Sequence, residues 1–245
     1  MLPAMSHVAP LVVALSLGTV AADRSGTRYM DCGGTSLCGV LTVESGFGTG
    51  YYQHDKPAVH GLWPEVGAYG SSSCIAPKDT TPPSTLFPCY QGGDPSHQLD
   101  FEQHEWSKHG VCSATKNASD FFSQICALAQ APLGVMSTTR ASGVTNTSIY
   151  AKDLASAGYA VWDTMENGQV ELSACARADG SWVLGAVADF GTLCGAGPVA
   201  PPSPTTSSCV PGAHGPTCSS DADCAGKTGC VRCAHSGFCT DVPLA

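Results

Sequence analysis

The sequence has few charged side chains, and few basic ones in particular. Charged residues make up 13% of its 245 residues and hydrophobic residues 43%, a balance that excludes an intrinsically disordered polymer. The 11 Lys and Arg residues are outnumbered by 20 Asp and Glu, which gives a formal net charge of -9. Such a chain lacks the overall positive field of proteins that bind nucleic acid by counterion release. A polyanionic ligand would therefore have to be held by a local cluster of cations, to which histidines contribute at mildly acidic pH.

Beyond its first few dozen residues the sequence has no long hydrophobic run, which excludes a bundle of membrane helices. Residues 8–21 are nearly all apolar or small, are too short to span a bilayer, and end in small residues suited to a signal peptidase. No Lys or Arg precedes them, and the alternative is a buried N-terminal strand or helix. We expect a signal peptide at residues 1–22. The protein would then be secreted, either extracellular or held in an acidic endomembrane compartment such as a vacuole or lysosome.

Cysteine, by contrast, is abundant, and its 14 residues fit an oxidising compartment in which disulfides form. Two sequons, at Asn117 and Asn146, are candidate glycosylation sites in the same compartment. Pro, Gly, Ser and Thr dominate residues 195–208, which we interpret as a linker. The linker separates a main domain at residues 23–194, with eight cysteines, from a C-terminal module at residues 209–245, with six.

The main domain mixes helical and extended patterns. Three segments have helical character: residues 99–113, residues 119–130 with Ser119 as the N-cap, and residues 148–160 with Ser148 at the start. Two β-rich runs, at residues 169–177 and 181–190, are separated by Asp179-Gly180, a dipeptide typical of a hairpin turn. Because strands and helices do not alternate strictly, the pattern favours an α+β domain.

Ionisable side chains of complementary type are concentrated in two short segments. The first is HGLWP at residues 60–64, and the second is FEQHEWSKHGVC at residues 101–112. Residues four apart share one face of a helix, so Glu105 and His109 are expected to face a single reacting centre. A carboxylate beside a histidine helps the ring to keep its proton, which suits acid chemistry.

His104 and Lys108 form a second pair four residues apart and are expected on the neighbouring flank of the same helix. Histidine can donate or accept a proton near neutral or mildly acid pH, so two histidines can serve as acid and base. One helix can hardly flank both the attacking and the leaving atom, and His60 is the candidate for the second histidine. The alternative is that His60 is structural and that the helix presents an ordinary solvated face.

The dipeptide His104-Glu105 also begins the zinc-protease pattern HExxH, but the rest of that pattern fails. The fourth residue after His104 is Lys108. His109 is five residues on, about 140° around the helix, which is unsuited to shared metal ligation. We expect no metal and no other cofactor.

HGLWP and HEWSKHGVC resemble the two active-site signatures of the T2 family of secreted acid ribonucleases, which includes fungal and plant vacuolar enzymes and the pollen-rejection ribonucleases. The resemblance covers about residues 28–194. It implies an antiparallel β-sheet with packed helices. It also implies a metal-independent endoribonuclease that converts single-stranded RNA to 2′,3′-cyclic phosphate and then 3′-phosphate ends, with no action on DNA.

The resemblance also assigns roles to individual residues. His60 is similar to the general acid for the leaving group, and His109 to the general base. Glu105 and Lys108 would stabilise the transition state, and His104 would help to bind phosphate.

Trp63 looks like part of the nucleobase pocket, with buried core as its alternative, and Tyr69 is a further candidate for the same wall. The loop after Pro64 is longer and richer in Ser and Gly than is usual in the family, and the Gln-Trp-Pro strand that often precedes HGLWP is missing. Both departures concern base preference. The resemblance implies four disulfides: Cys89–Cys112, Cys175–Cys194, Cys32–Cys74 and Cys38–Cys126.

The C-terminal module has its six cysteines within about thirty residues, so it must be held together by covalent bridges. The short pair Cys230 and Cys233 allows a zinc site as the alternative to disulfides. The cysteine spacing resembles knottins, particularly small plant metallocarboxypeptidase inhibitors, whose inhibitory C-terminus is not matched by residues 240–245. We expect an appendage that binds an unknown protein, glycan or surface, on a monomeric chain.

Two further functional hypotheses are a catalytically idle, secreted, cysteine-rich binding protein and a protease inhibitor that acts through the C-terminal module. The presence of all five catalytic-type side chains argues against the first of these. The second treats the main domain as a carrier only.

Overall fold

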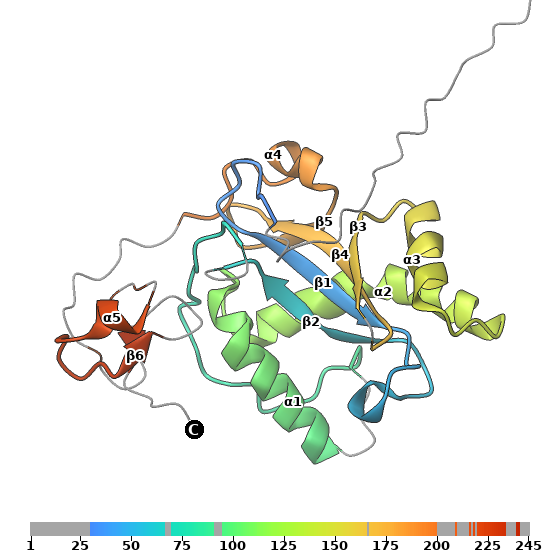
Figure 1. Cartoon of the computed structure of the whole chain (residues 1–245), viewed down its shortest axis with the longest axis horizontal. Helices are drawn as coiled ribbons and strands as arrows, with labels where there is room; N and C mark the ends of the chain where they lie inside the picture. The colour runs from blue at the N-terminus through green and yellow to red at the C-terminus, as the bar shows by residue number, and fades with distance from the viewer. Residues whose placement is uncertain are drawn as a thin grey trace, which may run out of the picture.

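The computed structural model describes residues 30–66, 70–90, 95–165 and 167–199, and in the C-terminal module residues 209, 216, 218, 220–233 and 239–240. The signal peptide expected at residues 1–22 lies outside this part of the chain, as do Tyr69 and residues 200–208 of the expected linker. The expected α+β architecture is confirmed, with an antiparallel sheet and several packed helices (Figure 1).

The sheet has the strand order β2-β1-β4-β3, with β5 also paired to β4, and these pairings are antiparallel. The strands are β1 at Cys38–Glu44, β2 at Ala58–Pro64, β3 at Val161–Met165, β4 at Gln169–Ala176 and β5 at Trp182–Leu184. β1 lies between β2 and β4 and is buried at every position, which its apolar sequence CGVLTV allows. The buried strand β1 therefore holds its neighbour β2, and the side chains on β2, in fixed positions.

The main core forms between one face of the sheet and helix α2. Helix α2 (Ala118–Ala141) contacts β1, β2 and β5. Its aromatic pair Phe121 and Phe122 is fully buried in the same cluster as Leu41 and Leu172 of the sheet. Close-packed apolar contacts of this kind fix the sheet against the helix. Val40 and Cys175, which alternate along their strands with residues of the main core, belong to a second apolar cluster with Phe190.

The helices differ from expectation at their ends. α1 spans Pro95–Lys108 and stops before His109, where the expected helix over residues 99–113 continues only as a short 3-10 helix at Gly110–Cys112. The N-cap of α2 is Asn117, whose side chain accepts a 2.9 Å hydrogen bond from the Asp120 N–H, and not Ser119. α2 also continues well past residue 130.

Helix α3 (Thr147–Ser156) shows the same shift at its start, because its N-cap is Asn146 and not Ser148. The Asn146 side chain accepts a hydrogen bond of 2.9 Å from the Ser148 N–H. Asn is among the best N-cap residues, so an Asn two positions earlier takes the role. Both sequons therefore place their asparagine at a helix N-terminus.

The expected hairpin at Asp179-Gly180 is confirmed. β4 and β5 pair as antiparallel neighbours, and Gly180 adopts φ +81°, a conformation that favours glycine. The second expected β-run, at residues 181–190, is wrong beyond Leu184. There the chain forms a 3-10 turn and then the short helix α4 (Phe190–Leu193).

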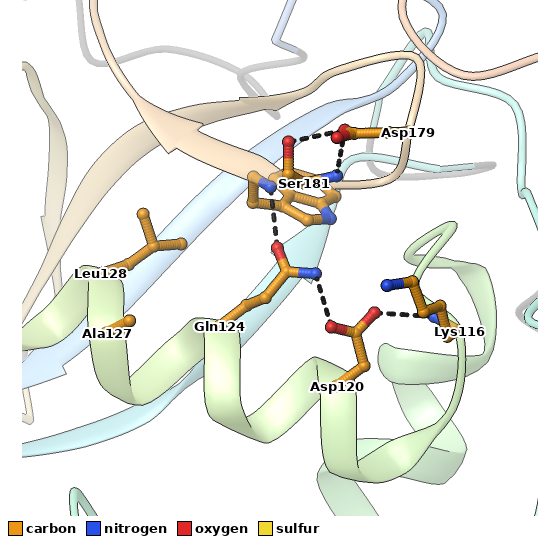
Figure 2. A pocket seen from close by; sticks show the side chains of 8 residues that line it. Lys116, Asp120, Gln124, Ala127, Leu128, Asp179 and Ser181 are labelled. Carbon is orange, nitrogen blue, oxygen red and sulfur yellow. Dashed lines mark hydrogen bonds between the residues drawn. The ribbon is translucent and has the colours of Figure 1, made fainter.

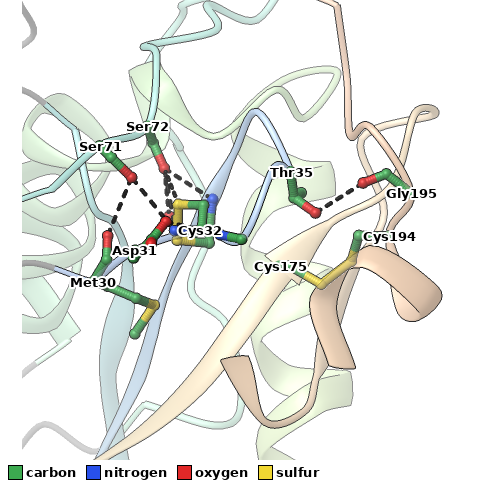
Figure 3. Close-up of a disulfide and its surroundings, with 11 residues drawn as sticks. Met30, Asp31, Cys32, Thr35, Ser71, Ser72, Cys175, Cys194 and Gly195 are labelled. Atoms are coloured by element: carbon green, nitrogen blue, oxygen red, sulfur yellow. Dashed lines mark hydrogen bonds between the residues drawn. A yellow bond between two sulfur atoms is a disulfide. The ribbon is translucent and has the colours of Figure 1, made fainter. Parts of the chain in front are cut away.

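Of the four expected disulfides in the main domain, Cys175–Cys194 is confirmed and is drawn in Figure 3. The other three pairings, Cys89–Cys112, Cys32–Cys74 and Cys38–Cys126, are wrong. The structure has Cys32–Cys38, Cys74–Cys112 and Cys89–Cys126 instead.

The reason lies in how the strands and helices bring the cysteines together. A bridge between Ile75 and Ser113 puts their preceding residues, Cys74 and Cys112, side by side with Cα atoms 4.5 Å apart. Cys89 instead meets helix α2 at Cys126, and that bridge ties the segment before α1 to the core helix. The bridge at Cys112 anchors the end of the second signature.

Residues beyond Cys194 fold back on the main domain. Ala196 accepts a hydrogen bond of 3.0 Å from the Ser36 N–H, and Pro198 accepts one from the Ser36 hydroxyl. The Thr35 hydroxyl donates to Gly195, as Figure 3 shows. The first residues of the expected linker are therefore attached to the main domain.

The C-terminal module is closed by three disulfides: Cys209–Cys230, Cys218–Cys233 and Cys224–Cys239. In chain order they join the first cysteine to the fourth, the second to the fifth and the third to the sixth. The described elements are the short helix α5 (Asp221–Cys224) and the strand pair β6 (Arg232–Cys233) and β7 (Cys239–Thr240). All 14 cysteines are paired, so the zinc alternative at Cys230 and Cys233 is wrong. Within the part of the chain described above, no helix has both the length and the apolar character needed to cross a membrane.

Candidate active site

β2 carries an irregularity at His60. Thr42 of β1 is paired with Gly61, but the next residue, Val43, is paired with Val59. His60 is therefore the extra residue of a β-bulge, a feature that turns a side chain out of the regular alternation. Val59 points into the main core, whereas the His60 ring lies against α1, where it meets the Phe101 ring at a centroid distance of 5.0 Å.

α1 supplies the carboxylate opposite His60. Glu105 is only 2% exposed, and its Oε1 lies 3.5 Å from His60 Nε2. Its Oε2 accepts a hydrogen bond of 2.9 Å from the indole N–H of Trp63. A Cβ at Gly61 would lie 2.2 Å from the same oxygen, so the carboxylate packs directly on the backbone of β2. Both signatures therefore hold Glu105 in place.

His109 lies where α1 ends. Its N–H donates a hydrogen bond of 2.9 Å to the Glu105 carbonyl, but its backbone leaves the helical conformation at φ -124° and ψ -46°. The Trp63 indole stacks on the His109 ring at a centroid distance of 5.3 Å and meets His60 edge-on at 4.9 Å. Trp63 thus connects the two histidines, which come from different elements.

The two histidines differ in protonation. Burial lowers the pKa of His60, but hydrogen bonds and negative charge from Glu105 and Glu44 outweigh burial and raise it to about 9. Burial lowers the pKa of His109 to about 4, with only partial opposition from Glu105. Between those two pH values one ring is cationic and the other is neutral, as an acid and a base must be.

His104 and Lys108 are exposed on α1, outside this buried group. Their positive charges contribute to the lowered pKa of His109, which places both within electrostatic reach of the centre. Trp106 points the other way and is buried in the main core, as its position on the helix predicts. Tyr69 lies outside the described residues.

Sequence reasoning missed Glu44 and Gln169 and assigned no role to His54. Glu44, at the end of β1, accepts hydrogen bonds from His60 Nδ1 at 2.6 Å and from His54 Nε2 at 2.8 Å. Gln169 of β4 donates to the same carboxylate at 3.2 Å. The available signal was a charged residue at the end of the apolar run CGVLTV, because a buried carboxylate needs partners.

A surface pocket of about 440 Å³ lies elsewhere, between α2 and the β4–β5 hairpin (Figure 2). Gln124 there accepts from the Trp182 N–H and donates to Asp120, and Asp179 accepts from Ser181. Polar lining groups that satisfy one another in this way serve to attach the hairpin to α2. None of the active-site candidates lines this pocket.

The arrangement at His60, Glu105 and His109 is suited to proton transfer at a phosphate ester. A cationic ring can protonate a leaving oxygen, a neutral ring can accept a proton from a nucleophile, and the exposed side chains of His104 and Lys108 can bind the phosphate. The buried Glu105 carboxylate holds the Trp63 indole, which contacts both rings.

Comparisons with known proteins agree with this chemistry. Residues 36–157, about half of the chain, match the model of the Ribonuclease T2 family. The chain is also similar to Ribonuclease Rh from Rhizopus niveus, with 29% identity over 129 residues that cover 44% of this chain and 54% of that protein. The chain thus spans about half the length of this curated relative. No solved structure matches the chain significantly.

Proposed function

Because this chain belongs to the Ribonuclease T2 family through residues 36–157, we propose that it is a metal-independent endoribonuclease that cleaves single-stranded RNA. Similarity to Ribonuclease Rh supports the same activity. The observation that carries the proposal is the pair His60 and His109, held beside the buried Glu105 with pKa values of about 9 and about 4. A catalytically idle binding protein would not need this separation.

In the proposed first step, His109 accepts the proton of the ribose 2′-hydroxyl and the 2′-oxygen attacks phosphorus. The bond from phosphorus to the 5′-oxygen breaks, and His60 donates the proton from Nε2 to that oxygen. Glu105 and Lys108 stabilise the charge distribution of the transition state, and His104 binds the phosphate. The product is a 2′,3′-cyclic phosphate.

In the second step the two rings exchange roles. His60 accepts a proton from water, which opens the cyclic phosphate, and His109 returns its proton to the 2′-oxygen. The result is a 3′-phosphate end. DNA is excluded as a substrate because it lacks the nucleophile.

Trp63 is proposed as part of the nucleobase pocket, since an aromatic face supports base stacking and this ring already lies between the two histidines. Tyr69 is proposed as a further wall of that pocket. Base preference is proposed to depend on the loop after Pro64, where the chain departs from the family.

We further propose the organisation inferred from composition: a signal peptide at residues 1–22, the catalytic domain at residues 23–194, a linker at residues 195–208 and a knottin-like module at residues 209–245. Secretion, glycosylation at Asn117 and Asn146, a monomeric state and binding of a protein, glycan or surface by the module belong to this proposal. The paired cysteines support an oxidising compartment.

The proposed activity is tested by incubating the purified, oxidised protein with single-stranded RNA and, separately, DNA in excess EDTA. We expect RNA to be cleaved at an undiminished rate, with 2′,3′-cyclic phosphate ends appearing before 3′-phosphate ends, and DNA to remain intact. End groups can be followed by chromatography of a dinucleoside phosphate substrate. Direct formation of 5′-phosphate ends would instead indicate hydrolysis by an activated water.

The dependence of kcat/KM on pH should be a broad bell centred slightly below neutral. His109 must be neutral, so the rate should fall as pH drops through its pKa of about 4. His60 must be protonated, so the rate should fall as pH rises through its pKa of about 9. Initial rates on a dinucleoside phosphate from pH 3 to 10 report these free-enzyme values. A rate that still rises above pH 9 would contradict the proposed roles.

A further inference from the structure

Glu44 joins two histidines through one buried carboxylate. It is 5% exposed; its Oε1 accepts from His60 Nδ1 at 2.6 Å, and its Oε2 accepts from His54 Nε2 at 2.8 Å. The other ring nitrogen of His54 faces the Lys56 carbonyl. Both partners of His54 are acceptors, so both of its nitrogens must carry hydrogen and the ring is cationic. The carboxylate therefore lies between two rings that each donate to it.

The backbone places Glu44 firmly. In the register of the sheet it is paired with Ala58 of β2 and with Gln169 of β4. Gln169 Nε2 lies 2.8 Å from His60 Nδ1 and 3.2 Å from Glu44 Oε1. Because a protonated Nδ1 and an amide nitrogen are both donors, the amide hydrogen goes to the carboxylate oxygen.

The loop that carries His54 is fixed from α2. The Arg140 guanidinium donates to the carbonyls of Ser45 and His54 and lies 3.8 Å over the Phe47 ring. Gly46, at φ +78°, allows the two arms of the loop to approach, since a Cβ there would lie 2.8 Å from His54 Nδ1. The hydrogen bonds from Arg140 and the close approach at Gly46 therefore fix the position of His54 beside Glu44.

We propose that Glu44 is the positioning residue of His60 and that His54 holds Glu44 in place. The Glu44 carboxylate keeps a proton on Nδ1 and so directs Nε2 toward the leaving 5′-oxygen. When Nε2 has given up its proton, the neutral ring retains Nδ1–H, which leaves a lone pair on Nε2 for the second step. This inference rests on the proposed function, because it assigns a partner to the proposed acid.

Glu105 cannot replace Glu44 in this role. It lies 3.5 Å from Nε2, the nitrogen that must reach the substrate, whereas Glu44 contacts Nδ1. Among the described residues four other groups face the His60 ring: Gln169 from β4, the Tyr52 ring stacked at a centroid distance of 5.7 Å, Trp63, and Phe101 from α1. None of these groups is negatively charged at neutral pH. Of the two carboxylates beside His60, Glu44 lies closer to the ring than Glu105 does.

The test is Glu44→Gln, which keeps the shape of the side chain but removes its charge, in the full oxidised chain. The His60 ring is titrated by NMR, and kcat/KM on a dinucleoside phosphate is measured against pH. We expect the His60 pKa and the alkaline limb of the profile to fall together by roughly 1–2 pH units, the size typical of a lost opposite charge. Asp189→Asn removes one negative charge at an exposed position and should move neither.

Glu44→Asp keeps the charge and should restore part of the alkaline limb, which loss of packing alone would not explain. If Glu44→Gln leaves both the NMR titration and the alkaline limb where they are in the unchanged protein, the inference is wrong. The NMR titration detects the interaction between Glu44 and His60 in the absence of substrate. A failure of the proposed function would therefore be recognised as missing RNA cleavage with the fall in the His60 pKa still present.

Discussion

His60→Ala and His109→Ala, each made alone, are expected to lower kcat/KM on a dinucleoside phosphate by about 10²–10⁴-fold, the range for loss of one proton transfer. Each substitution should also remove one limb of the pH profile. Loss of the acid at His60 removes the alkaline limb, and loss of the base at His109 removes the acid limb. Rates from pH 3 to 10 distinguish these effects from a general loss of active protein.

The fold should persist in both variants. Glu44 retains its hydrogen bonds to His54 and Gln169 when the His60 ring is removed, and His109 is at the end of α1, outside the main core. Circular dichroism and thermal denaturation check this. His97→Ala, at an exposed position of α1, is the matched control and should leave the rate unchanged. Near-normal turnover by a folded His109→Ala protein would contradict the proposed mechanism.

Gly61→Ala should reduce kcat by roughly 10²-fold, the loss that follows a displacement of about 1 Å at a reacting centre. The added Cβ would lie 2.2 Å from Glu105 Oε2 and 2.9 Å from Trp63 Nε1, so the carboxylate and the indole cannot both stay where they are. The backbone of Gly61 is not in the left-handed region, so the contact with Glu105 is the source of the effect.

Gly134→Ala is the control for this substitution. No heavy atom lies within 4 Å of a Cβ at Gly134, which is exposed within α2, and alanine there should stabilise the helix by roughly 0.5–1 kcal/mol. Steady-state kinetics and thermal unfolding of both variants separate the local effect from a global one. Full activity in Gly61→Ala would show that the position of Glu105 does not limit the reaction.

Local sequence patterns predicted much of the site. Glu105 and His109 lie one turn apart, because the N–H of His109, just after the end of α1, still donates to the Glu105 carbonyl. Asp179-Gly180 formed the expected hairpin because the turn geometry depends on neighbouring residues alone. The six closely spaced cysteines likewise predicted a module held by disulfides. Such features need no information about distant parts of the chain.

Other features depended on which distant segments meet. Three of the four expected disulfides in the main domain were wrong, because pairing follows Cα positions that only the packed sheet and helices define. The expected N-caps, Ser119 and Ser148, were each two residues too late, because the nearby Asn117 and Asn146 can also cap a helix and do so in the structure.

What the sequence alone determined here is the set of candidate catalytic side chains, since HGLWP and HEWSKHGVC carry their identity and local spacing. What only the tertiary structure decided is their electrostatic state. The bulge at His60 turns its ring toward Glu105, and the sheet register brings Glu44 to its other nitrogen. Burial and neighbouring charge then separate the pKa values of His60 and His109. A pKa depends on the dielectric surroundings and on charges a few ångströms away, and folding supplies both from segments far apart in the chain.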